Sequence, residues 1–145
     1  MKRISFDELL AKKAQREADK LRIGEISIPG SDTALAAKMP GEKTILDLFG
    51  EFLTASNPAE VLACGKHALY SCCPQLQDRE LQAELGVSDD PMQIVDTLFT
   101  IPEQDALGGA AFRFIGLVPP EKTPEKTEEA SDEDAADTGT ELVKN

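Results

Sequence analysis

The sequence has few aromatic side chains, no tryptophan and no long apolar run. Aromatic residues make up 5% of its 145 residues, so a core must come mostly from Leu, Ile, Val and Ala, within an apolar content of 41%. No apolar run approaches the roughly 20 residues that span a bilayer. The N-terminus also lacks the apolar segment of a secretory signal. We therefore expect one domain of ordinary size that stays in the cytoplasm and binds no membrane.

Side chains suited to catalysis or metal binding are equally scarce. The chain has one histidine, His67, and three cysteines, Cys64, Cys72 and Cys73. Zinc needs about four convergent ligands, and two adjacent cysteines cannot point the same way on a helix. Nothing marks an oxyanion hole or a third group beside Cys64 and His67. The sequence therefore predicts no enzyme, metal or cofactor, but reduced cysteines packed in a helical core and a partly exposed histidine.

Net positive charge is also lacking. The formal net charge is −12, and residues 119–145 account for half of it, with nine acidic residues against three lysines. Lys12, Lys13, Arg16 and Lys20 form a basic face on the first predicted helix, but acidic residues interrupt it. An acidic protein repels a phosphate backbone, so we expect no nucleic-acid partner.

The pattern of apolar residues predicts a first helix that begins at Ser5. Ser5 and Glu8 have the spacing of a capping box, and Phe6, Leu9 and Leu10 open an apolar stripe at helical spacing. The stripe is narrow and becomes rich in alanine toward Leu21. Such a stripe suits a helix that lies on a small surface, or one that awaits a partner.

A short β-hairpin and a block of helices follow. Alternation over 25–28, turn residues over 29–32 and a return over 33–38 predict the hairpin. Helices are then expected over 42–53, from the Asn57 cap and Pro58 up to Pro74, after Asp78, after Asp90 and after Pro102. We thus expect a mostly α, compact multi-helix domain over residues 1–118.

Residues 119–145 differ in composition from the rest. They open with Pro119 and Pro120, are rich in Glu, Lys, Thr, Asp and Ala, and hold only Leu142 and Val143 as large aliphatic residues. Such a segment cannot bury enough apolar area to offset the entropy of ordering. We expect a disordered acidic tail.

The order of these segments resembles the XkdN-like family of phage tail assembly chaperones. The resemblance covers roughly residues 1–118 and depends on three segments: the amphipathic start over 5–20, Ile26-Ser27-Ile28-Pro29, and the stretch from Leu69 to Leu81 with Gly86, Asp90-Pro91 and Ile94-Val95 after it. It implies a chaperone in the cytoplasm of the bacterial host that keeps the tail tape measure protein soluble until tail tube subunits polymerise around it. Such chaperones are absent from the finished virion and have no catalytic residues.

A chaperone of this kind needs accessible apolar side chains. The candidates for partner binding are Phe6, Leu9, Leu10 and Phe112. Phe112 lies off the stripe of the last predicted helix, so it belongs either to a wide core face or to an exposed anchor. The tail tube protein and a second copy of the chain are further possible partners. The alternative functions are a small helical DNA-binding regulator that uses the helices after Asp78 and Asp90, or another phage structural or interaction protein.

Overall fold

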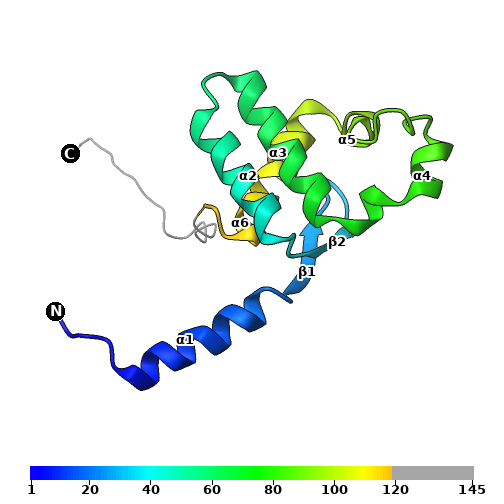
Figure 1. Cartoon of the computed structure of the whole chain (residues 1–145). Helices are drawn as coiled ribbons and strands as arrows, with labels where there is room; N and C mark the ends of the chain where they lie inside the picture. Colours follow the sequence, from blue (N-terminus) through cyan, green and yellow to red (C-terminus); the bar gives the residue numbers. More distant parts are fainter. Residues whose placement is uncertain (119–145) are drawn as a thin grey trace, which may run out of the picture.

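A computed structural model describes residues 1–118, and the predicted disordered tail over 119–145 lies outside the described residues. The described part is mostly helical, with an antiparallel hairpin after the first helix, as predicted (Figure 1). Its elements are α1 (Phe6–Asp19), β1 (Ile23–Ser27), β2 (Ala34–Lys38), α2 (Glu42–Thr54), α3 (Pro58–Cys72), the 3₁₀ helix η1 (Pro74–Gln77), α4 (Arg79–Glu84), α5 (Gln93–Leu98) and α6 (Ile101–Ile115).

The helices begin largely where capping residues predict. Ser5 and Glu8 form the capping box of α1, and the Asn57 and Asp78 side chains accept from the first-turn amides of α3 and α4. Two starts differ from the prediction. The last helix begins at Ile101, because Thr100 and Glu103 form a second capping box and place Pro102 inside the first turn. The helix expected at Asp90 begins at Gln93.

The β-hairpin turns one side toward the helices. Ile26 pairs with Leu35 across the two strands, and both side chains are buried, as is Ala37. The turn contains Gly30 at φ +75°, a conformation that glycine adopts without steric cost. The Gln75 side chain of η1 accepts from the Ala36 amide at 2.8 Å, which ties β2 to the helical part.

Helices α3 and α6 form the centre of the fold and approach each other closely at two glycines. A Cβ built on Gly108 would lie 2.7 Å from the Gly65 Cα atom, a distance that atoms do not tolerate. Gly108 therefore has a packing role, beyond the loss of helix stability that glycine brings by itself. Around this contact lie fully buried Leu69, Leu107 and Ala111.

The three cysteines are part of this core. Cys64, Cys72 and Cys73 are free thiols, each at most 2% exposed. The prediction that they pack as small apolar side chains in a helical core is confirmed. The same core includes Ile26 and Leu35 of the hairpin, Leu48 of α2 and Ile94 of α5, so one core joins the hairpin to the helices.

Candidate functional site

Helix α1 projects from the rest of the molecule as an arm, which we define as residues 1–20 (Figure 1). None of the residues of α1 is buried against the other residues of the described part, 1–118. Phe6 is 75% exposed, and Leu9 and Leu10 are about half exposed. These three side chains lie at helical spacing on one side of the helix, and we call them the arm face. Three of the predicted candidates are thus accessible and adjacent.

The base of the arm is fixed to the body by charged side chains. Arg16 forms an ion pair with Glu42 at the start of α2, and the Lys20 ammonium lies 4.0 Å from the same carboxylate. Just after α1, Arg22 donates to the Phe114 carbonyl, and its guanidinium lies 4.9 Å from the centre of the Phe114 ring. The last turn of α1 is therefore held in place, while its N-terminal turns extend into solvent.

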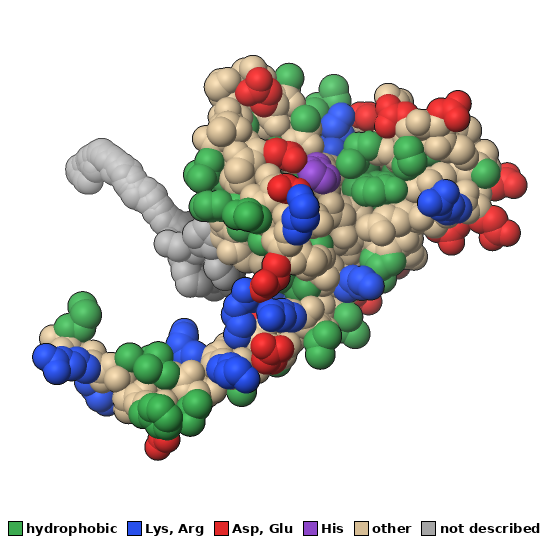
Figure 2. Space-filling view, in the orientation of Figure 1, with side chains coloured by type: hydrophobic (Ala, Val, Ile, Leu, Met, Phe, Trp, Pro, Cys, Tyr) green, Lys and Arg blue, Asp and Glu red, His purple; other side chains and the backbone are tan. Residues whose placement is uncertain are grey.

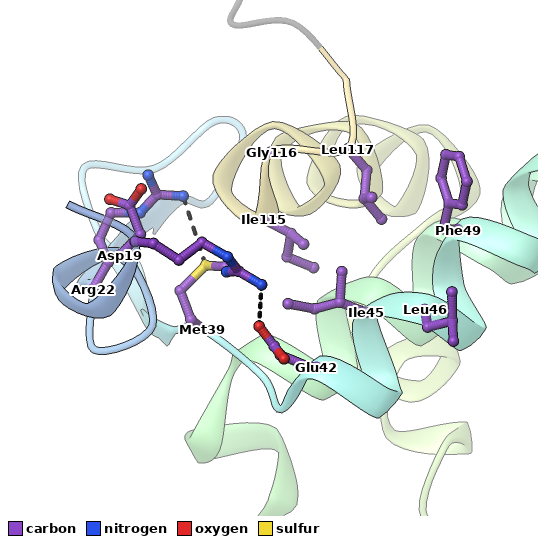
Figure 3. Close-up of a pocket in the computed structure, with 11 residues that line it drawn as sticks. Asp19, Arg22, Met39, Glu42, Ile45, Leu46, Phe49, Ile115, Gly116 and Leu117 are labelled. Carbon is purple, nitrogen blue, oxygen red and sulfur yellow. Dashed lines mark hydrogen bonds and ion pairs between the residues drawn. The ribbon is translucent and has the colours of Figure 1, made fainter. Parts of the chain in front are cut away.

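An open cavity of about 610 Å³ lies where the arm meets the body (Figure 3). One side is charged, with Arg16, Asp19, Arg22 and Glu42. The opposite side is apolar and comes from α2 and the end of α6, with Ile45, Leu46, Phe49, Ile115 and Leu117. The cavity is amphipathic in the same way as the arm, with apolar side chains beside charged ones.

Helix α2 continues this apolar surface along the body. Leu46 is 68% exposed, Leu53 is 64% exposed and Phe49 is 42% exposed. They lie three, four and seven residues apart, which places them on one side of the helix, and we call them the α2 face. Figure 2 shows green side chains on this part of the body and on the arm. Sequence reasoning placed these residues in a helix but did not identify them as a surface, because α2 also has apolar residues on its buried side, such as Leu48.

Phe112 is not part of this surface. It is 5% exposed, and its ring packs against Phe52 with the ring centres 5.2 Å apart. Of the two roles predicted for Phe112, the core role is therefore right and the exposed anchor is wrong. The physical reason is that Phe52 of α2 packs on this side of α6, which the pattern of α6 alone does not reveal.

The cysteines are buried, whereas the histidine reaches the surface. Burial raises the pKa of the Cys64 thiol, and the hydrogen bond with the adjacent Cys72 thiol, together with burial, raises the pKa of Cys73. The His67 side chain is 31% exposed, as predicted, and its Nδ1 atom lies 2.9 Å from the Glu51 carboxylate. Within residues 1–118, no group of three or more His, Cys, Asp and Glu side chains is placed to hold a metal ion.

The helices expected to form a DNA-binding motif are short and lie in an acidic part of the chain. Helices α4 and α5 have six residues each. Between 78 and 96, Arg79 is the only basic residue, whereas Asp78, Glu80, Glu84, Asp89, Asp90 and Asp96 are acidic. This surface would repel the phosphates that a recognition helix must approach.

No protein-family model, no curated protein and no solved structure matches this chain. Among residues 1–118, none of the helices combines the length and apolar character of a membrane span. The candidate site consists of an amphipathic arm, an amphipathic cavity at its base and an apolar face on α2.

Proposed function

We propose that this protein is a phage tail assembly chaperone that binds the tail tape measure protein and keeps it soluble until the tail tube forms. The observation that carries the proposal is the arm, whose Phe6, Leu9 and Leu10 are exposed on a helix fixed only at its base. Single exposed apolar side chains are common on proteins, but three that lie together on one side of a projecting helix indicate a binding role. The resemblance to XkdN-like proteins supplies the identity of the partner.

The proposed mechanism is the capture of one helix by another. An unassembled tape measure segment exposes an apolar stripe, and the arm offers a matching stripe with charged flanks. Binding lowers the free concentration of the segment and therefore its rate of aggregation. The high net charge of −12 keeps the complex in solution. The protein acts in the host cytoplasm, performs no catalysis, is released as the tail tube protein polymerises and is absent from the virion.

Co-expression with the tape measure protein of the same phage tests the proposal. We expect more soluble tape measure protein and a complex that co-purifies. The variant with Phe6→Ser and Leu10→Ser should lose most of this capture, while the melting temperature of the monomer stays near that of the wild type, because both side chains are exposed in a single chain.

A matched control is Ile101→Ser, which removes an apolar side chain that is 66% exposed at the start of α6, away from the arm. It should capture the tape measure protein as the wild type does. Failure of the wild-type chain to solubilise or co-purify the tape measure protein, at both low and high salt, would remove the chaperone assignment.

A further inference from the structure

The arm and the body of this chain are complementary in charge. The first 22 residues hold seven Lys and Arg against four Asp and Glu, a net charge of +3. Residues 23–118 hold five Lys and Arg against fourteen Asp and Glu, a net charge of −9. In Figure 2 blue side chains lie along the arm, and most of the red side chains lie on the body, which also carries some blue ones. An arm with this charge is attracted to a surface like the body that carries it.

The same two parts also have matching apolar faces. The arm face, Phe6, Leu9 and Leu10, extends over about one helical turn, and the α2 face extends over about two. Within one chain, Arg16 and Lys20 of the arm already pair with Glu42 of α2. The basic side of α1 and the acidic start of α2 are therefore compatible surfaces, as the structure itself shows.

The arm face cannot reach the α2 face of its own chain. Phe6 lies ten residues before Arg16, about 15 Å further along a continuous helix. Because Arg16 is held at Glu42 and α1 points away from the body, a straight helix keeps the two faces apart (Figure 1). The complementary surface must come from another molecule.

We propose that two copies of this chain exchange their arms, so that the arm face of each copy packs on the α2 face of the other. Such a contact is isologous and closes on itself as a dimer with twofold symmetry. It covers both apolar faces of both copies and brings basic arms against acidic bodies. The proposal concerns the free protein and does not depend on the identity of its client.

Sedimentation velocity of the full chain tests the proposal. We expect a species of twice the chain mass of 15.7 kDa, whose dissociation constant rises with salt because arm and body attract each other electrostatically. A chain that remains monomeric at every concentration and salt would overturn the exchange. If such a monomer still captured the tape measure protein, the proposed function would stand without the dimer.

Mixing two variants distinguishes arm exchange from other dimers. The arm variant has Phe6→Ser and Leu10→Ser, and the face variant has Leu46→Ser and Leu53→Ser. Each variant alone should dimerise at least about tenfold more weakly than the wild type, because central apolar contacts dominate such interfaces. Their mixture should form heterodimers, since the intact arm of the face variant fits the intact α2 face of the arm variant.

Two results would contradict this pairing. If the face variant dimerises like the wild type and the arm variant does not, the arms pair with each other. If the mixture is no tighter than either variant alone, the two faces do not meet. Ile101→Ser serves as the control that should leave the dimer unchanged. If a double variant fails to fold, the single changes Leu9→Ser and Phe49→Ser test the same two faces.

Discussion

Helices α1 and α6 are alike in length and in the way they begin, and they differ in what covers them. They have 14 and 15 residues, and each begins with a capping box. Yet α6 buries Leu107, Phe112 and Ile115, whereas α1 buries no residue against the rest of the described part, 1–118. Local signals determine that a helix forms. They do not determine whether its apolar side is covered by the same chain or by another molecule.

The difference lies in how far the apolar stripe extends. In α6 it runs the length of the helix, and Gly108 allows the α3 backbone to approach. In α1 the stripe is interrupted, because Lys13 and Glu17 lie seven residues after Phe6 and Leu10 and so occupy the same side. A helix of this length is marginal in water without packing. The arm therefore depends on its own capping and backbone hydrogen bonds to stay helical. A partner that packs on it should also stabilise its helical conformation.

Truncation of one leucine in each helix should show the largest contrast. Leu107→Ala in α6 removes a side chain that is 1% exposed and should lower the free energy of unfolding by about 2–5 kcal/mol. Leu10→Ala in α1 removes a half-exposed side chain and should change the free energy of unfolding by less than about 0.5 kcal/mol. Urea unfolding followed by circular dichroism measures both, at a protein concentration low enough for the chain to be monomeric. A comparable loss in the two variants would mean that the arm packs on the body in solution.

The two adjacent glycines of α6 should respond to alanine with opposite signs. In Gly108→Ala the new Cβ meets the Gly65 backbone at 2.7 Å, so we expect the free energy of unfolding to fall by about 1–3 kcal/mol. In Gly109→Ala the nearest atom is Arg113 Nη1 at 3.5 Å. Because this change removes a glycine from a helix interior, it should raise the free energy of unfolding by at most about 1 kcal/mol. Thermal and urea unfolding give both values. Equal effects would show that helix propensity, rather than the α3–α6 contact, governs this site.

Gly108 also shows where prediction from sequence ends. Most of the helix caps, the hairpin and the cysteine core followed from local patterns, because capping and turn chemistry depend on residues near one another in the chain. The α3–α6 contact joins residues 43 positions apart, and no local pattern at Gly65 or Gly108 reveals it. For the same reason the arm face was predictable as a stripe, while the burial of Phe112 and the exposure of Leu46 were not.

Removal of the two capping hydroxyls should separate global from local stability. Thr100→Ala deletes the cap of the packed helix α6 and should lower the free energy of unfolding by about 1 kcal/mol. Ser5→Ala deletes the equivalent cap of α1 and should leave global unfolding unchanged, while amide exchange in the first turns of α1 becomes faster. Hydrogen exchange resolved by residue measures both effects, at a protein concentration low enough for the chain to be monomeric. A shift of the global transition by Ser5→Ala would mean that the arm is part of the cooperative unit.

The smallest effect should come from the protonation of Glu8 in the capping box of the arm. Hydrogen bonds from Ser5, including its amide at 2.8 Å, lower the pKa of the Glu8 carboxyl. A carboxyl whose pKa is lower in the folded state stabilises that state above the unfolded pKa. This contribution is lost as the pH falls through the folded pKa. Acidification below the usual carboxyl range should therefore loosen the first turn of α1, seen as a drift of the Cα chemical shifts of residues 5–9 toward coil values.

The first turn of α6 is the internal reference, because packing at Leu107 holds it. In Glu8→Gln the side chain still accepts from the Ser5 amide but does not titrate, so the drift should disappear. If the glutamine variant drifts in the same pH range, another group is responsible, and the cap of the arm does not depend on the charge of Glu8.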